Sequence, residues 1–325
     1  MSTAPPATAP FPSAAPLPPA PPAFRGRIGR DARSGYHAAA RRYRLYLSLS
    51  CPSCLRIALT HSLLGLRETL PVMLLPAVPD GPDGEYSVLR PLYESSSHRH
   101  PGPASAPVLS DDWSGRIVST HSPDILRDLA RHFDRPGPDR PALYPPGAEE
   151  EIETVARLSE YGIGEAARRA GRPGADAMAR RAALGALFRA LGSLERRLAT
   201  RRFILGEAIT IADVWLWVAL VRFDTVHRPH LDAAAVHRAA RHPWLWSYAR
   251  RLAAHPAFGP LLDLDGIARR HRAPGKAPRA GGTPPRILDW SRHSAGGAAA
   301  PPSPVGADGF MEPQHVRHLR RSGSA

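Results

Sequence analysis

The run Cys51-Pro52-Ser53-Cys54 constrains the fold of this chain most, because it stands between two segments of different hydrophobic period. Apolar and polar side chains alternate over residues 43–50, which predicts a strand. After the motif, spacings of three and four residues separate the apolar positions Leu55, Leu59, Leu63 and Leu66, which predicts a helix. Proline fits the first turn of a helix, where its missing N–H costs nothing. The sequence therefore predicts a cysteine at a strand-to-helix junction.

Further elements follow this junction in an order that is typical of a mixed α/β domain. The apolar run 70–78 predicts a second strand, and two short apolar runs around the turn 111–115 predict a hairpin. The run Ser122-Pro123-Asp124 then predicts a helix that reaches Phe133, with Ser122 as its N-cap and proline at its first position. The predicted order is strand, helix, strand, hairpin, helix.

Beyond a linker rich in proline and glycine, the hydrophobic spacing is helical almost throughout. One apolar stripe consists of Leu184, Leu187, Leu191, Leu194 and Leu198. Another helix begins at Thr210, where Asp213 completes a capping-box pattern. Because the segment that follows is apolar nearly all round, we expect it to be buried at the centre of a helix bundle.

These patterns predict two domains, one α/β and one all-α. We expect the α/β domain at residues 24–134, a linker at 135–147 and the helical domain at 148–270. The ends, residues 1–23 and 271–325, are rich in proline, alanine, glycine and arginine. Such segments carry too little apolar surface to offset the entropy of ordering, so we expect both ends to be disordered.

The net charge of +14 raises the question of nucleic-acid binding, but the excess is concentrated at the two ends. Residues 1–42 hold six arginines and a single acid, and residues 266–325 hold nine arginines and Lys276 against three acids. The predicted domains between them are nearly balanced in charge. We therefore expect at most nonspecific anion binding by the ends, and no specific nucleic-acid recognition.

The cysteine content and the length of the apolar runs indicate in which cellular compartment we expect the protein. Both of the 2 cysteines lie in one motif, which excludes a disulfide framework. The stretch from Met1 to Ala23 lacks the positive start and continuous apolar core of a signal peptide. No run of 18 apolar residues predicts a membrane span. We expect a cytoplasmic protein.

The segment 42–52, with Arg56 five residues past the first cysteine, resembles the opening of the bacterial glutathionyl-hydroquinone reductases, the xi-class glutathione transferases. A second match far along the chain consists of Arg202-Phe203-Ile204-Leu205-Gly206, Thr210, Asp213, residues 218–224 and residues 242–246. The resemblance covers roughly residues 24–268. It implies an N-terminal thioredoxin-like domain followed by a C-terminal glutathione-transferase helical bundle, glutathione or a related low-molecular-weight thiol as cosubstrate, and a homodimer.

The resemblance also implies roles for individual residues. Cys51 would be the catalytic thiolate, a form that the N-terminus of a helix stabilises. Cys54, one helical turn on, would either act as a second catalytic thiol that resolves a mixed disulfide or lie in the core as a small apolar residue. The candidate glutathione-binding residues are Arg56, Ala106, Pro107 in a cis peptide bond, His121 and Ser122.

Several of these residues also have a purely structural interpretation. Arg56 could equally be a solvated arginine on a helix face, and for His121 a position on a loop without ligand contact is favoured. Ser122 would cap its helix in either case. Trp215 and Trp217 are expected to pack in the core rather than to bind a cofactor.

The chain departs from the family pattern at several positions. The family has tryptophan directly after Cys-Pro, where this chain has Ser53, and an acid where it has His121. A family tyrosine falls near Arg168, with Tyr161 close by. The tyrosine-rich C-terminal segment of the family has no counterpart in residues 269–272. These departures leave the substrate open.

We therefore expect a cysteine-type, glutathione-dependent transferase or reductase that acts on glutathionylated aromatic or disulfide-type substrates through a mixed disulfide. A glutaredoxin-like dithiol oxidoreductase is a rival with the same chemistry. The alternative from another class is a transferase-like binding or regulatory module with weak or no catalysis. A zinc site is not expected, because a Cys-x-x-Cys motif needs two further ligands and no second cysteine pair exists.

Overall fold

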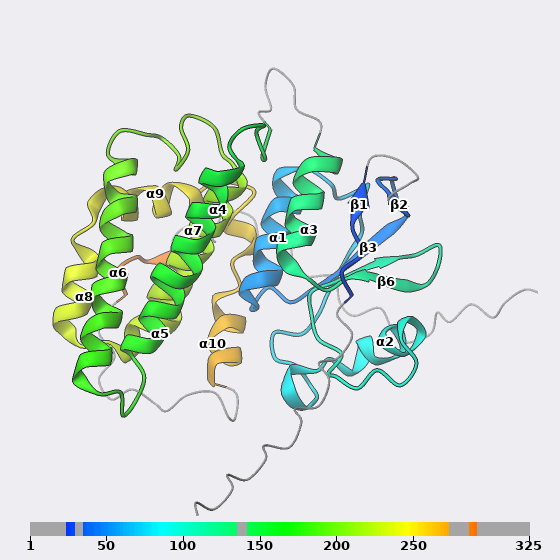
Figure 1. Ribbon diagram of the computed structural model, residues 1–325, viewed down its shortest axis with the longest axis horizontal. Coiled ribbons are helices and arrows are strands. Elements are labelled where there is room, and N and C mark those ends of the chain that lie inside the picture. Colours follow the sequence, from blue (N-terminus) through cyan, green and yellow to red (C-terminus); the bar gives the residue numbers. More distant parts are fainter. Residues whose placement is uncertain (1–23, 30–34, 135–141, 273–285, 291–325) are drawn as a thin grey trace, which may run out of the picture.

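A computed structural model of the chain describes residues 24–29, 35–134, 142–272 and 286–290. A small sheet flanked by helices forms the N-terminal part, and a bundle of helices forms the C-terminal part (Figure 1). This arrangement agrees with the α/β and all-α parts predicted from the sequence. Residues 1–23 and most of 271–325, for which we predicted disorder, lie outside the described residues.

The main sheet has four strands in the order β4-β3-β5-β6. Their bounds are Tyr43–Leu47 for β3, Val72–Leu74 for β4, Val108–Asp111 for β5 and Arg116–Ser119 for β6. Strand β3 pairs with β4 in parallel and with β5 antiparallel, and β5 and β6 form the predicted hairpin. A separate pair joins β1 (Ile28–Gly29) to β2 (Tyr36–His37).

Helices cover both faces of this sheet (Figure 1). On one face lie α1 (Pro52–Leu63) and α3 (Ser122–Asp128), packed against each other and against the buried side chains of Tyr43, Leu45 and Leu47. On the other lies α2 (Arg90–Ser96), whose Tyr93 belongs to a second apolar cluster. The period-two pattern of β3 explains why the sheet has an apolar cluster on each face, because alternate side chains of a strand point to opposite faces.

The C-terminal part contains seven α-helices among the described residues. They are α4 (Glu149–Arg157), α5 (Ala166–Ala170), α6 (Ala177–Leu198), α7 (Ile211–Arg222), α8 (Ala233–Ala240), α9 (Pro243–Ala253) and α10 (Leu264–Arg272). Helices of 3₁₀ or π type are, in the N-terminal part, η2 (Pro82–Gly84), η3 (Ser87–Leu89) and η4 (Leu129–Phe133), and in the C-terminal part η5 (Leu158–Glu165), η6 (Phe223–His227), η7 (Arg228–His230) and η8 (Gly259–Leu261).

Helix α7 lies at the centre of the bundle, as its apolar sequence predicted. Thr210 and Asp213 form the predicted capping box, and Asp213 is fully buried. Its carboxylate accepts hydrogen bonds from the N–H groups of Ile204 and Thr210 at 2.9 and 2.8 Å and from the Tyr248 hydroxyl at 2.9 Å. Asp213 is therefore a structural residue. Trp217 donates its indole N–H to a carbonyl of α9, which confirms its role in packing.

Three local predictions were wrong in detail. The first two strands are shorter than predicted. A turn in which the Cys51 N–H donates to the Ser48 carbonyl at 2.9 Å ends the first strand, and Pro71 and Pro76 flank the second. The N-cap of α3 is His121 rather than Ser122. The His121 carbonyl accepts the N–H of Ile125 at 3.1 Å, and Ser122 is already the first helical residue.

The expectation that the chain is disordered from residue 271 onward was wrong for residues 271–272, which end α10, and for residues 286–290. Leu288 and Trp290 are buried, and the Asp224 carboxylate accepts the Leu288 N–H at 3.0 Å and the Trp290 indole N–H at 2.9 Å. Trp290 also packs edge-on against Trp217, with ring centroids 6.0 Å apart. The Asp224 carboxylate and the Trp217 ring thus anchor residues 286–290, which no hydrophobic pattern in the surrounding sequence had indicated.

Candidate active site

The strand pairing gathers three of the predicted site segments at one edge of the sheet. Cys51 follows the carboxyl end of β3, and the antiparallel pairing of Tyr46 with Val108 places Pro107 beside that end. The pairing of Leu109 with Ser119 brings the carboxyl end of β6, and hence Ser122, to the same edge. Tertiary structure therefore collects residues that are far apart in the sequence.

Cys51 is the N-cap of α1, in an extended conformation, with its carbonyl accepting the Leu55 N–H at 2.8 Å. Pro52 occupies the first turn, as predicted. The side chain of Cys51 is partly exposed, whereas Cys54 is fully buried among the apolar residues beneath the helix. Both cysteines are free thiols.

The surroundings of Cys51 favour its thiolate. A hydrogen bond from the Cys54 thiol is the largest cause that lowers the pKa of Cys51 to about 5, against the opposing effect of burial. The N–H groups of Cys54 and Ser53 and the positive charge of Arg270 add to this effect. Burial and the neighbouring thiolate raise the pKa of Cys54, which remains a thiol. The two cysteines thus take opposite protonation states.

Arg56 lies one turn along α1 and is buried, so its interpretation as a solvated arginine was wrong. Its guanidinium stands 3.9 Å from the centre of the Trp215 ring, and its Nε donates to the Pro52 carbonyl at 3.3 Å. Burial lowers the pKa of Arg56 to about 10. The charge of Cys51 stabilises the Arg56 cation in turn, so the two groups interact electrostatically.

The sequence analysis missed Arg270. Its Nη1 donates to the Tyr86 hydroxyl at 2.8 Å and lies 3.3 Å from the Ala77 carbonyl and 3.5 Å from Ser50 Oγ. These contacts place it beside the turn that carries Cys51. The spacing of Leu264 and Ile267 could have indicated the helix, but nothing local indicates that its arginine reaches across to the sheet.

Ala106, Pro107 and Ser122 lie where a thiol ligand beside Cys51 could meet them. The Ala106–Pro107 peptide bond is cis, as expected. The hydroxyl of Ser122 is buried, yet it has no hydrogen-bond partner within the described parts of the chain. A buried hydroxyl without a partner carries a desolvation cost that a bound ligand would offset, so this atom is a candidate ligand contact.

The His121 ring is engaged with protein groups. Its Nδ1 lies 2.8 Å from an Asp124 carboxylate oxygen and 3.0 Å from the Arg25 guanidinium, which itself pairs with Asp124 at 3.0 Å. This cluster fixes the start of α3 to the N-terminal segment 24–29. It agrees with the structural interpretation of His121 and identifies no ligand contact.

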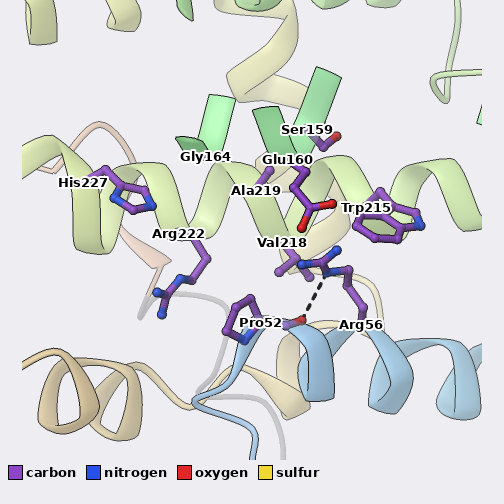
Figure 2. Close-up of a pocket in the computed structure, with 10 residues that line it drawn as sticks. All are labelled: Pro52, Arg56, Ser159, Glu160, Gly164, Trp215, Val218, Ala219, Arg222 and His227. Atoms are coloured by element: carbon purple, nitrogen blue, oxygen red, sulfur yellow. Dashed lines mark hydrogen bonds between the residues drawn. The ribbon is translucent and has the colours of Figure 1, made fainter. Parts of the chain in front are cut away.

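A cavity of about 160 Å³ lies between α1 and α7, next to the cysteine motif. Pro52 and Arg56 form one wall, and Trp215 and Arg222 from α7 form the other (Figure 2). Figure 2 also shows the Glu160 carboxylate, from η5, directed toward Arg56. With two arginines and one glutamate in its lining, this recess beside the cysteine motif carries a net positive charge, and the Cys51 side chain is not among its lining residues.

Neither a metal site nor a membrane-spanning helix is found within residues 24–29, 35–134, 142–272 and 286–290. No group of three or more histidine, cysteine, aspartate and glutamate side chains is arranged to hold a metal ion. None of the helices in these segments is long and apolar enough to cross a membrane.

Comparison with known proteins points to one family. Residues 177–251 match the family model described as glutathione S-transferase, C-terminal domain. The glutathionyl-hydroquinone reductase PcpF of Sphingobium chlorophenolicum is 30% identical over 257 residues, which cover 74% of this chain and 80% of that protein.

Two solved structures share the fold. A xi-class glutathione transferase from Natrialba magadii matches with a TM-score of 0.66 and 25% identity, over 77% of this chain and 81% of that one. The glutathione-bound structure of YqjG from Escherichia coli K-12 matches with a TM-score of 0.64 and 26% identity, over 76% and 87% of the two chains. The chain belongs to the glutathione transferase superfamily, in the xi class that includes the glutathionyl-hydroquinone reductases.

Proposed function

We propose that this protein is a glutathione-dependent reductase or transferase in which the Cys51 thiolate is the nucleophile. The observation that carries the proposal is the position of Cys51 at the N-terminus of α1, where N–H groups, the Cys54 thiol and Arg270 lower its pKa to about 5. A thiol with this pKa is almost fully ionised near neutral pH, and the thiolate is the reactive form. Relatives named as glutathionyl-hydroquinone reductases support glutathione as the cosubstrate.

In the first step, the Cys51 thiolate attacks the glutathione sulfur of a glutathionylated substrate. A disulfide forms between Cys51 and glutathione, and the bond between that sulfur and the substrate breaks. The bonding electron pair leaves with the substrate fragment, which takes up a proton and is released in reduced form. Arg56, Arg222 and Arg270 are described cations that interact with the charge of Cys51 and favour the thiolate before the attack.

In the second step, a thiolate attacks the mixed disulfide and displaces one of its two sulfurs. If a second glutathione attacks, oxidised glutathione forms and the Cys51 thiolate returns in one displacement. If Cys54 attacks, a Cys51–Cys54 disulfide forms, glutathione leaves, and two further thiols must reduce the protein. We propose the first course, because burial raises the pKa of Cys54 and keeps it as the unreactive thiol.

We propose that glutathione lies along the edge of the sheet that carries Cys51. The main chain of Ala106, before cis Pro107, would pair with its cysteinyl segment, and Ser122 would bind its γ-glutamyl carboxylate. The support for Ser122 is its buried hydroxyl without a described partner. We assign Arg56 to the electrostatics of the thiol and His121 to the support of α3.

A single-turnover assay with aryl glutathionyl adducts tests this function. Cys51→Ala should reduce the rate of aryl product release by at least about a thousandfold, while the circular dichroism spectrum stays unchanged. Cys54→Ser is the matched control and should retain turnover with these adducts. Full activity of Cys51→Ala would overturn the proposal. Binding of glutathione with no turnover in the unmodified protein would instead favour a binding or regulatory module.

The dithiol course is tested on the same variants with a protein disulfide as substrate. A dithiol enzyme would lose this activity in Cys54→Ser, whereas the one-cysteine mechanism predicts little activity in either protein. Mass spectrometry of the trapped intermediate adds a direct measure. A mass increase of one glutathione on the unmodified protein supports the proposed course, and an internal disulfide contradicts it.

We further propose a homodimer in a reducing compartment. The support for the compartment is the presence of two free cysteines, one of them with a reactive setting. Light scattering after size-exclusion chromatography measures the assembly, and a monomeric mass at micromolar concentration would contradict the dimer.

A further inference from the structure

A second and larger cavity, of about 650 Å³, opens beside the carboxyl end of α7. Its walls come from α5, η6, η7 and α10 and from the loop after α5. Figure 1 shows α10 between the bundle and the sheet-bearing part. Six of the lining residues are basic or imidazole side chains: Arg168, Arg172, Arg222, His227, His230 and His271.

The charge of this cavity is not balanced. Arg168 forms an ion pair with Glu165 at 2.6 Å, so its charge is offset. Arg172 and Arg222 have no carboxylate partner among the described residues, and no acidic residue lines the cavity. A concave surface with two unpaired guanidinium groups attracts a small anion.

Arg222 connects this cavity to the reactive thiol. It is the last residue of α7 and also lines the smaller cavity beside Pro52, toward which its side chain points in Figure 2. Burial lowers the pKa of Arg222, and the charge of Cys51 opposes that shift. A partly buried cation without a described hydrogen bond is costly unless an anion meets it.

The histidines add hydrogen-bonding capacity to the cavity. Burial and the adjacent Arg222 lower the pKa of His227 to about 3, so this ring is neutral near pH 7. The Nε2 atoms of His230 and His271 lie 3.1 Å apart, and one donates to the other. Ala167 and Val226 supply buried apolar surface in the same wall. The lining suits a molecule with an apolar body and an acidic group.

We propose that this cavity holds the non-glutathione part of the substrate, and that it selects organic anions, with Arg222 as the residue that binds their carboxylate. The assignment of the cavity to a substrate rests on the proposed function. The preference for an anion rests only on the residues that line the cavity. Arg222 lines both cavities, so a carboxylate bound to it would hold the substrate where this cavity adjoins the one beside the cysteine motif.

Equilibrium binding of two matched probes tests the preference without any turnover. Calorimetry compares 2-naphthoate with its neutral isostere 2-naphthamide on the full chain. We expect naphthoate to bind about tenfold more tightly, as a charge-assisted hydrogen bond would give. Arg222→Gln should remove this difference, Arg222→Lys should keep part of it, and Arg250→Gln, an exposed arginine of α9 away from the cavity, should keep all of it.

The Cys51→Ser variant separates this proposal from the proposed function. Its preference for naphthoate should remain, because the anion site does not need the thiol. Equal binding of both probes to the unmodified protein, or a preference that survives in folded Arg222→Gln, would overturn the anion site. An intact preference in a protein whose Cys51 never turns over would overturn only the proposed reaction.

The kinetic arm compares aryl glutathionyl adducts that carry a para-carboxylate or a para-carboxamide. The carboxylate should react about tenfold faster at subsaturating concentration, and Arg222→Gln should reduce that ratio to near one. A ratio that stays at about ten in Arg222→Gln would show that a group other than Arg222 recognises the charge of the carboxylate. A ratio of one in the unmodified protein would contradict a role of this cavity in substrate selection.

Discussion

Arg270 donates a hydrogen bond to the hydroxyl of Tyr86 at 2.8 Å, and this bond joins the last described α-helix of the bundle to the segment after β4. The same guanidinium lies near Ser50, at the turn before Cys51. One of the positive charges near the nucleophile therefore comes from the C-terminal half of the chain. Docking of α10 and the acidity of the thiol are coupled in this fold.

Removal of the charge on Arg270 should make Cys51 less acidic. In Arg270→Gln we expect the pKa of Cys51 to rise by roughly half a unit to one unit, because a neighbouring positive charge that favours the thiolate is lost. The pH dependence of alkylation by iodoacetamide measures this shift. Arg272→Gln is the matched control, since this exposed arginine donates to the Ala268 carbonyl of its own helix, and its profile should not move.

The reactivity of Cys51 should rise with pH through a midpoint of about 5 rather than near 8.5, the value for an ordinary thiol. The sign follows from the lowered pKa, because the thiolate forms above the midpoint and is protonated below it. Cys54→Ala removes the hydrogen bond that lowers this pKa most, so its midpoint should move upward. A midpoint that remains unchanged in Cys54→Ala would show that the two thiols do not interact.

Ser122→Ala should weaken glutathione binding without loss of stability. The lost hydrogen bond should raise the dissociation constant about three- to tenfold. The free energy of unfolding should stay within about 0.5 kcal/mol or increase, because the buried hydroxyl has no described partner in the unliganded protein. Calorimetry and urea denaturation measure the two quantities. Ser114→Ala, whose hydroxyl bonds to Asp111 in the hairpin turn, should leave binding unchanged.

The segment 286–290 should contribute to stability although residues 273–285 separate it from α10 in the sequence. Trp290→Ala should lower the free energy of unfolding by about 3–5 kcal/mol, because it empties a buried aromatic site and removes a hydrogen bond to Asp224. Trp244→Ala, at a tryptophan that is 55% exposed, should change it by less than about 1 kcal/mol. Similar effects of the two variants would contradict the packing of this segment.

Local signals were sufficient for the elements that build the site. The alternation before Cys51 and the proline after it predicted β3 and the start of α1, and the capping-box pattern predicted the start of α7. Each of these signals depends on residues within one turn or one strand. Exact ends were less predictable, since the position of the N-cap of α3 depends on backbone conformation that Ser122 alone does not fix.

Local sequence patterns were enough to predict that Cys51 lies at a strand-to-helix junction and that a helical bundle follows, because periodicity and caps are local properties. Tertiary packing was needed to show that Arg56 is buried against Trp215, that Arg270 reaches the turn before Cys51, and that Arg222 faces two cavities. Burial and charge at a site depend on which elements meet there. Such contacts join residues separated by much of the chain, and no local pattern specifies them.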